Sequence, residues 1–293
     1  TLTILTTTFS EGPRRTAAIS AWNAVGAAGG AAGGILGGTL TELLSWRWTL
    51  YVNLIFAGAA FIGGAILLTR QSSQVKPKLD IPGVLLVSSA LFCLVYGFSN
   101  AATHGWHTPS TWGFLVAGVA LLVLFAVWQT RAPDPLLPPR IVLDRNRGGA
   151  YASMLIASSG MFGVFLFLTY YLQQTLDYTP VITGFAILPI AGGIAVAANL
   201  STIVLMPRIG PKPLVAAGML IAAGAMTWFA QLGAHTGYAA GVLGPLLLAG
   251  IGLGMVIAPV INTGTFGVAP QDAGEASATV TAGQQLGASI GTA

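Results

Sequence analysis

Long runs without charged residues alternate with short charged segments along the whole chain. Eight runs contain no Lys, Arg, Asp or Glu: residues 17–40, 48–69, 82–101, 110–130, 149–173, 181–206, 213–232 and 238–262. A helix rises 1.5 Å per residue, so a run of about 20 residues crosses the ~30 Å hydrocarbon core of a bilayer. A charge in the middle of such a helix would cost roughly 2.5–3.5 kcal/mol on insertion scales. The pattern therefore predicts an all-α polytopic membrane protein with eight full transmembrane helices.

Both ends of the sequence add a partial span to this count. Residues 1–8 have the composition of the end of an earlier span, and an uncharged run begins near Gly274 after Asp272, with Glu275 near its start. The chain also starts with Thr1 rather than Met. We therefore expect a part of a longer protein that lacks both ends, with two partial helices in addition to the eight full ones.

The basic residues of the connecting segments fall almost entirely on one side of the predicted membrane. When the segments are assigned to alternating sides, one side holds Arg47 and the other holds Arg14, Arg15, Arg70, Lys76, Lys78, Arg131, Arg140, Arg145, Arg147, Arg208 and Lys212. Cytoplasmic loops carry such an excess of Lys and Arg, so the larger group predicts the cytoplasmic face. Trp46, Trp48, Trp106 and Trp112 lie at predicted outer ends, as in an interfacial aromatic belt.

The composition excludes the main soluble classes of protein. Charged residues make up 7% of the chain, whereas a soluble domain has about 25%. The helices of a large soluble protein would need a charged outer face, which these runs do not have. The pI of 9.5 reflects basic cytoplasmic loops, so we expect the lipid bilayer and no nucleic acid as a partner. Cys93 is the single cysteine and forms no disulfide within the chain.

The run at 17–40 contains the glycine-rich stretch GAAGGAAGGILGG. Its glycines form two rows along a helix: Gly26, Gly30, Gly34 and Gly38 in one, and Gly29, Gly33 and Gly37 in the other. Glycines spaced by four residues allow helix backbones in a membrane to approach closely. This feature fits tight packing alone, and it equally fits a helix interface that slides or hinges during transport.

The same stretch resembles the antiporter signature of the major facilitator superfamily, g-x-x-x-G-P-x-x-G-G. Its positions here are Gly29, Gly33, Gly34, Gly37 and Gly38, with Gly34 where the family has Pro. The following segment, SWRWTLYVNL (45–54), is similar to one of the fourteen-span drug:proton antiporters of EmrB/QacA type. Ile55 stands where that segment continues with Pro.

Further matches spread the resemblance over essentially the whole chain. They are FSEGPRRTAAISAW (9–22), YYLQQTLDYTPVITGFAILP (170–189), MPRIGPKP (206–213) and GEASATVTAGQQLGASIGTA (274–293). Asp177 replaces a usual Gly, and Pro207 replaces a usual Asp. The resemblance implies a partial major-facilitator fold of a bacterial protein in the plasma (inner) membrane. Residues 1–70 would end the N-terminal bundle, 71–147 would be a two-helix insertion with cytoplasmic linkers, and 148–293 would be part of the C-terminal bundle.

The resemblance also implies which spans line a central cavity: 17–40, 149–173, 181–206, 238–262 and the last partial span. Polar and aromatic side chains in or beside these spans are candidates for the substrate cavity: Asn23, Phe162, Phe165, Tyr170, Tyr171, Gln173, Gln174, Asn199, Asn262, Gln284 and Gln285. Each has helix packing or a helix–helix hydrogen bond as its alternative role. As a set they indicate a neutral, aromatic-rich cavity for amphipathic or apolar compounds.

The sequence has no arrangement typical of an enzyme, a metal site or an ATP-driven pump. His104 and His107 lie in a predicted outer loop without an acidic residue or cysteine beside them, and His235 is alone in another. No span holds a His or an acid that would activate a Ser or Thr nucleophile, and no Gly-Lys-Ser/Thr phosphate loop is present. We predict a protein that is not an enzyme and holds no cofactor or metal.

These observations predict a secondary active transporter, with proton-coupled efflux of small amphipathic or drug-like molecules as the leading hypothesis. A dedicated metabolite carrier of the same fold is the alternative. A third hypothesis, a membrane enzyme or receptor without transport activity, would need an embedded acid, His or metal cluster, which the spans do not contain. Since no carboxylate lies within them, we expect the proton-binding carboxylate in N-terminal helices that precede this chain.

Overall fold

The computed structural model describes residues 13–67, 80–133, 135–137, 144–233, 236–265 and 273–292. These residues form helices joined by turns, and none of them lies in a strand. The first helices are α2 (Pro13–Leu43), α3 (Trp46–Leu67), α4 (Ile81–His104) and α5 (Pro109–Gln129). Then follow α7 (Arg145–Tyr170), η1 (Tyr171–Thr175), α8 (Pro180–Leu200), η2 (Ser201–Leu205), α9 (Met206–Ile209), α10 (Pro211–Phe229), η3 (Tyr238–Val242), α11 (Leu243–Thr265) and α12 (Ala273–Thr292). The all-α class is therefore confirmed.

Seven of the described helical stretches are long and apolar enough to cross a membrane. They are Trp46–Ile66, Ile81–Ala101, Pro109–Gln129, Arg145–Thr175, Pro180–Ile209, Pro211–Phe229 and Tyr238–Gly264. The eighth predicted run, 17–40, is helical in α2 but is not among the seven. The final partial span is helical in α12, and residues 1–8 lie outside the described residues.

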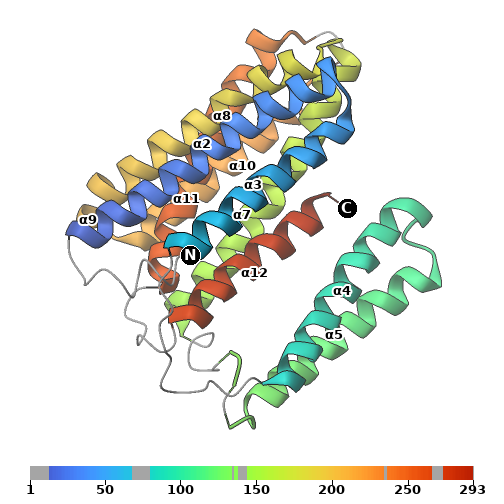
Figure 1. The fold of residues 1–293 in the computed structure, drawn as a ribbon, viewed down its shortest axis with the longest axis vertical. Coiled ribbons are helices and arrows are strands. Elements are labelled where there is room, and N and C mark those ends of the chain that lie inside the picture. The colour runs from blue at the N-terminus through green and yellow to red at the C-terminus, as the bar shows by residue number, and fades with distance from the viewer. Residues whose placement is uncertain are drawn as a thin grey trace.

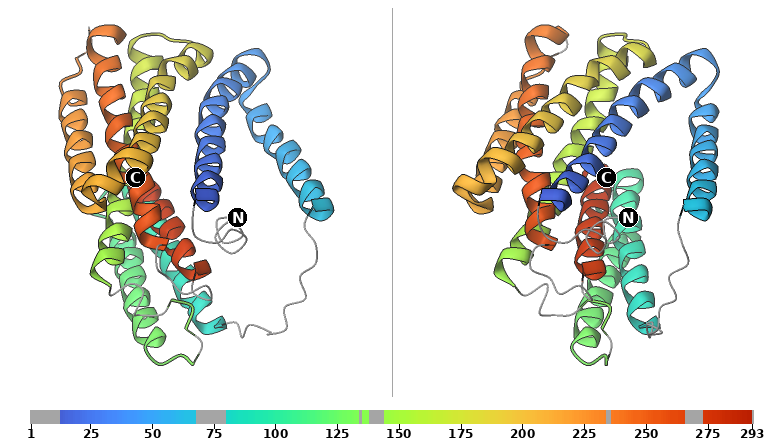
Figure 2. Two further views of the ribbon diagram at one scale, coloured as in Figure 1. Left: turned by 90° about the vertical axis from the view of Figure 1, so that its left-hand side faces the viewer. Right: turned by 60° about the vertical axis from the view of Figure 1, so that its left-hand side comes forward.

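The larger group of helices is organised around α11. Helices α7, α8 and α10 all pack against it, while α12 packs along α7 and α2 packs along α8 (Figure 1). Fully or almost fully buried side chains from three of these helices form the core, among them Met154, Ile190, Leu246, Val256 and Val260. Figure 2 shows α3 descending from the end of α2 and standing away from this group.

Glycines sit where the helices of this group cross. A Cβ atom added to Gly250 of α11 would lie 2.5 Å from the carbonyl oxygen of Ile190 in α8. One added to Gly252 would lie 2.7 Å from the carbonyl oxygen of Gly218 in α10. Small residues permit such close approach, and dispersion contacts between backbones then stabilise the association of helices in lipid.

Helices α4 and α5 form a hairpin that packs mainly on itself and meets α12 through α4 (Figure 1). At one end, the side-chain amide of Asn100 donates to the hydroxyls of Ser110 and Thr111, both at 2.9 Å. At the other end, Asp80 accepts from Gly83 N–H, from the Trp128 indole and from the Gln129 amide. Burial alone would raise the pKa of Asp80, but these hydrogen bonds outweigh it and lower that pKa.

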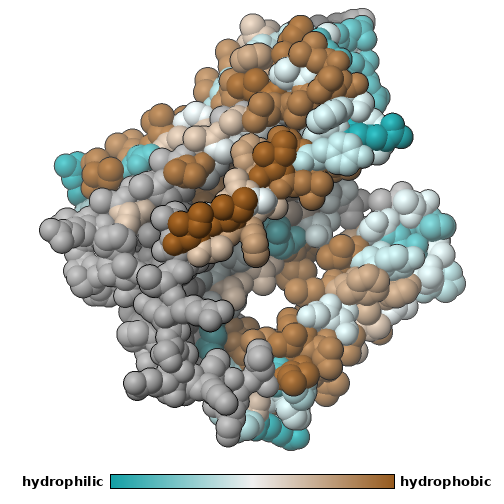
Figure 3. Space-filling view, viewed as in Figure 1, coloured by the Kyte–Doolittle hydropathy of each residue, from teal (hydrophilic) through white to brown (hydrophobic). Residues whose placement is uncertain are grey.

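Large apolar side chains cover the outside of the helices. Phe61 of α3 is 79% exposed and Leu220 of α10 is 74% exposed. Figure 3 shows hydrophobic residues over the exposed lengths of the helices and hydrophilic ones mostly near their ends. Lipid is the solvent that such a surface requires, because water would be a poor one for contiguous apolar area of this extent.

Candidate functional site

The glycine motif of α2 meets α8 near one end of both helices. A Cβ atom on Gly184 of α8 would lie 2.6 Å from the carbonyl oxygen of Gly34, and one on Gly38 would lie 2.5 Å from that of Pro180. Gly37 faces α3 instead, where its Cβ would lie 3.6 Å from the methyl group of Thr49. The motif therefore packs two helices against α2 at its C-terminal end.

The remaining glycines of the motif have open space around them. A Cβ on Gly26, Gly29, Gly30 or Gly33 would meet no atom of the described structure within 4 Å. The close approach to α8 is thus confined to the end that carries Gly34 and Gly38. By the distribution of Lys and Arg this is the outer end, so the glycine rows of α2 lose contact toward the cytoplasm.

A carboxylate reinforces the same contact. Glu42, in the last turn of α2, accepts a hydrogen bond at 3.1 Å through Oε2 from the backbone N–H of Val181, in the first turn of α8. The first N–H groups of a helix have no partner within it and carry the positive end of its dipole. Thr179 serves the same end of α8, since its hydroxyl accepts from Ile182 N–H. The Glu42 contact joins the start of α8 to the end of α2, whereas Thr179 caps α8 from within its own segment.

The aromatic candidates lie in and after the second half of α7. Phe165 and Tyr171 pack against the buried core, and Phe162 is half-buried. The Tyr171 hydroxyl lies 2.9 and 2.7 Å from the carbonyl oxygens of Gly233 and Thr236, which ties η1 to the connection between α10 and α11. Tyr170 is 54% exposed. The Tyr171 hydroxyl is therefore held by hydrogen bonds to the backbone, whereas the Tyr170 side chain lies largely outside the core.

The polar candidates are spread along the bundle. Gln173 and Gln174 are exposed in η1, and exposed Asn199 donates to the Ala195 carbonyl within α8 at 2.8 Å. On α12, Gln284 is half-buried and Gln285 is exposed. Residue Asn23 lies in α2, but its side chain is outside the described residues. The described structure places the glutamines of η1 at the outer end of α7 and Asn199 toward the opposite end of α8, so it does not gather these groups at one point.

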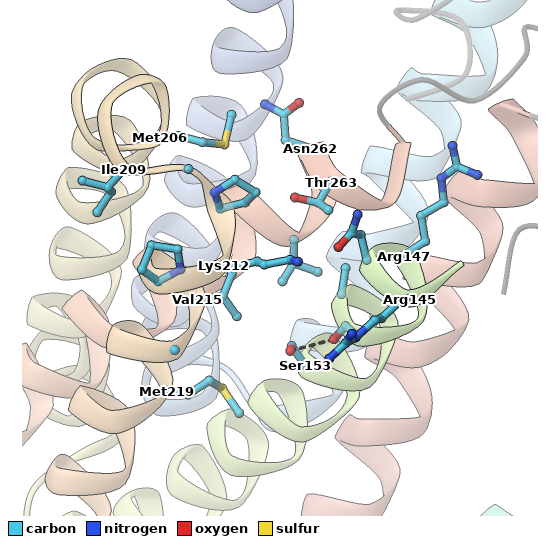
Figure 4. Close-up of a pocket in the computed structure, with 18 of the residues that line it drawn as sticks. Arg145, Arg147, Ser153, Met206, Ile209, Lys212, Val215, Met219, Asn262 and Thr263 are labelled. Atoms are coloured by element: carbon cyan, nitrogen blue, oxygen red, sulfur yellow. Dashed lines mark hydrogen bonds between the residues drawn. The ribbon is translucent and has the colours of Figure 1, made fainter. Parts of the chain in front are cut away.

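Asn262 instead lines a cavity at the cytoplasmic ends of three helices. The cavity has a volume of about 1160 Å³ and lies between the starts of α7 and α10 and the second half of α11 (Figure 4). Its polar and charged lining comprises Asp144, Arg145, Asn146, Arg147, Ser153, Lys212, Asn262 and Thr263. From the sequence we predicted a topological role for the cations. These cations lie at the starts of two helices on the same predicted face. That position could have indicated from the sequence that they lie close together.

Comparison with known proteins identifies the family. The model of the Major Facilitator Superfamily matches residues 1–292. The chain belongs to this superfamily. Its members are transporters, which agrees with the prediction that the chain is not an enzyme. Among the described residues, no group of three or more His, Cys, Asp or Glu could hold a metal ion; His235 lies outside them.

Curated relatives of this superfamily match over the whole chain. The puromycin resistance protein of Streptomyces alboniger is 42% identical over 294 residues, the cephamycin export protein of Amycolatopsis lactamdurans 37% over 299, and the tetracenomycin C resistance and export protein of Streptomyces glaucescens 32% over 293. Each alignment covers 100% of this chain but only 58%, 61% and 54% of the respective relative. The chain thus spans a little over half the length of these bacterial transporters.

Membership of the superfamily also settles the cellular location. The seven apolar helices of membrane length and the bacterial relatives make this a multi-pass protein of the bacterial plasma membrane. In a major-facilitator protein the glycine contact between α2 and α8 joins two parts of the chain that are far apart in sequence. The contact is built from Gly34, Gly38 and Glu42 of α2 against Pro180, Val181 and Gly184 of α8.

Proposed function

We propose that this chain is part of a secondary active exporter that moves small amphipathic or drug-like molecules out of the cell in exchange for protons. The observation that carries the proposal is the match, over the whole chain, to relatives named for resistance to or export of three different antibiotics. The proposal assigns the chain to the fourteen-span antiporter branch and treats it as a part that lacks both ends.

The arrangement of α2 and α8 supports alternating access as the mechanism. Gly34 and Gly38 touch α8 at the outer end, whereas a Cβ atom on Gly26 or Gly30, nearer the cytoplasm, would meet none of the described atoms within 4 Å. A transporter that is closed outside and open inside has this geometry. To release substrate outward, the contacts at Gly184, Pro180 and Val181 would have to open while the cytoplasmic ends approach each other.

The proposal divides the chain into three parts. Residues 1–70 end the N-terminal bundle, 71–147 form a two-helix insertion with cytoplasmic linkers, and 148–293 belong to the C-terminal bundle. The substrate cavity would lie between the two bundles and use the neutral polar and aromatic residues of α7, α8, α11 and α12. Since the described spans carry no carboxylate at mid-membrane depth, the proton-binding group is assigned to helices that precede this chain.

The experiment is transport by the purified full-length protein in liposomes with an acidic interior. Molecules whose cytoplasmic face points outward should accumulate puromycin or a cationic dye, and a protonophore should abolish the accumulation. Movement of no such compound under the pH gradient would overturn the proposal. A narrow, saturable preference for one metabolite would overturn drug export in favour of a dedicated carrier. A first span without Asp and Glu would count against proton coupling.

A further inference from the structure

The cavity at the cytoplasmic ends of α7, α10 and α11 has the charge of an anion-binding site. Its lining carries three cations, Arg145, Arg147 and Lys212, against one carboxylate, Asp144. That carboxylate already has a role, because its Oδ1 accepts from the backbone N–H groups of Asn146 and Arg147 at 3.1 and 3.0 Å. Among the described residues that line the cavity, cations therefore outnumber carboxylates.

The start of α10 adds a backbone hydrogen-bond donor to the cavity lining. No side chain caps the first turn of α10, which begins after Gly210, a residue with φ of 78°. Pro211 and Pro213 have no N–H group, so Lys212 N–H is the first backbone donor of this helix. An anion near the uncapped N-terminus of a helix of this length is favoured by the dipole and by unpaired N–H groups.

The other walls of the cavity are apolar. Met206, Val215, Met219 and Val260 line it together with the cationic groups. Figure 4 shows Lys212 extending from α10 toward α7, with Val215 and Met219 further along the same helix. The cavity thus joins a polar, cationic mouth at the level of the cytoplasmic interface to an apolar surface at greater depth.

We propose that this cavity binds an anionic phospholipid of the cytoplasmic leaflet, with its phosphate beside Lys212 and Arg145 and part of an acyl chain against Val215 and Met219. Basic pockets between transmembrane helices on the cytoplasmic side suit such headgroups. A free phosphate would satisfy the cations but would leave the apolar walls empty. A neutral lipid would cover the apolar walls but would lack the net charge that the cations complement. The site goes beyond the proposed export activity, and its test requires no transport.

The test measures lipid binding to the purified full-length protein in detergent by native mass spectrometry. The probes are dioleoyl phosphatidylglycerol, dioleoyl phosphatidylcholine and glycerol 3-phosphate. Phosphatidylglycerol should bind selectively. Lys212→Gln and Arg145→Gln should each weaken its binding about fivefold, since a cation near an anionic lipid surface contributes about 1 kcal/mol. Binding of phosphatidylcholine should stay unchanged in both variants.

Two further variants separate this site from general surface charge. Arg208→Gln is the matched control, because Arg208 is an exposed cation of α9 on the same face that does not line the cavity. It should leave phosphatidylglycerol binding unchanged. Val215→Trp keeps every charge but fills the apolar part, and it should abolish selective binding.

Several outcomes would overturn the proposal. They are an equal loss in Arg208→Gln, competition by glycerol 3-phosphate as strong as that by phosphatidylglycerol, or equal binding of the two lipids. Absence of selective lipid binding to the full-length protein, as when another segment of the chain fills the cavity, would also overturn it.

Discussion

The carboxylate of Glu42 in the last turn of α2 accepts a hydrogen bond at 3.1 Å from the backbone N–H of Val181 in the first turn of α8. The two residues are 139 positions apart in the sequence. Their contact lies at the end of the helix pair where Gly38 meets Pro180 and Gly34 meets Gly184. The contact between α2 and α8 at this end is thus made by backbone atoms, by glycines and by one charged side chain.

Replacement of Glu42 should weaken the contact between the end of α2 and the start of α8. Glu42→Ala should lower the free energy of unfolding by about 0.5–1 kcal/mol, because an exposed carboxylate at a helix N-terminus contributes this amount. Glu42→Gln keeps an acceptor for Val181 N–H and should lose less. Thermal unfolding of the purified full-length protein measures both effects, and high salt should narrow the gap between wild type and Glu42→Gln.

Thr41→Ala is the matched control for Glu42. The Thr41 hydroxyl lies 3.2 Å from that of Thr49 in α3, so its loss affects the α2–α3 hairpin and not the contact with α8. If Glu42→Ala and Thr41→Ala had the same salt-dependent effect, a specific role of the Glu42 carboxylate at α8 would be refuted.

Substitution of Gly184 should separate α2 from α8. In Gly184→Ala the added methyl group would lie 2.6 Å from the Gly34 carbonyl oxygen, so one backbone has to move. Such overpacking costs typically about 1–3 kcal/mol. We expect a lower unfolding temperature and slower pH-driven export, measured on the full-length protein.

The control for Gly184→Ala is Gly30→Ala in α2, four residues before Gly34 in the same glycine row. A Cβ at Gly30 meets no described atom within 4 Å, and Ala is a better helix former than Gly by up to about 1 kcal/mol. The free energy of unfolding of the Gly30→Ala variant should therefore equal or exceed that of the wild type. A loss of stability in Gly30→Ala as large as in Gly184→Ala would contradict the confinement of the contact to the outer end.

The helices themselves were predictable from the sequence because one physical rule governs them. Lipid excludes charge, so each uncharged run marks a helix, and the structure confirms a helix in every one of the eight runs. The close approach at Gly34 and Gly38 was also predictable from glycine spacing. The partner helix was not, because spacing identifies a flat helix face and does not identify the helix that covers it.

The grouping of side chains was much harder to predict. Asn262 belonged in the predicted set with Asn199, but only Asn262 lines the cavity at the cytoplasmic end, beside cations interpreted as topology markers. The hydrogen bond between Asn100 and Thr111 in the α4–α5 hairpin could not be predicted, because one Asn within an apolar run has many possible partners. Depth in the membrane follows from position along a run, whereas the direction of a side chain depends on packing with distant segments.

Acid should weaken the cytoplasmic end of the α4–α5 hairpin through Asp80. Hydrogen bonds from Trp128, Gly83 and Gln129 lower its pKa in the folded state despite the opposing effect of burial. A group with a lowered folded-state pKa stabilises the fold above its unfolded pKa of about 4, and this contribution is lost as the pH falls through the folded value. The free energy of unfolding should therefore decrease as the pH falls below about 4.

Asp80→Asn provides the measurement for this effect. At pH 7 it should cost about 1 kcal/mol, because the amide keeps one oxygen acceptor for Gly83 N–H but has no second oxygen to accept from the Gln129 amide, and the difference from wild type should shrink as the pH falls below about 4. Hydrogen exchange of the Gly83 and Val84 amides follows the same end of α4 directly. A difference between wild type and Asp80→Asn that stays constant from pH 7 to pH 3 would contradict the assigned role.

The connection between α7 and α8 contains a residue in a conformation that favours glycine. Asp177 has φ of 52°, in the left-handed region, and it stands where the resemblance places a usual Gly. An L side chain in this region costs roughly 1–2 kcal/mol, less for Asp because its short polar side chain tolerates the conformation. The usual glycine of the family thus has a physical reason, and Asp is the kind of residue that replaces it with least strain.

Variants at Asp177 should therefore follow backbone preference. Asp177→Gly should be neutral or stabilise slightly, since relief of strain is partly offset by the greater freedom of Gly in the unfolded chain. Asp177→Val should lose about 1–2 kcal/mol, because a β-branched residue is strongly disfavoured at positive φ. Gln174→Val, at an exposed position of η1 with ordinary φ, is the control and should change the unfolding temperature little. Equal losses in Asp177→Val and Gln174→Val would show that hydrophobic exposure, rather than the backbone, sets the cost at this turn.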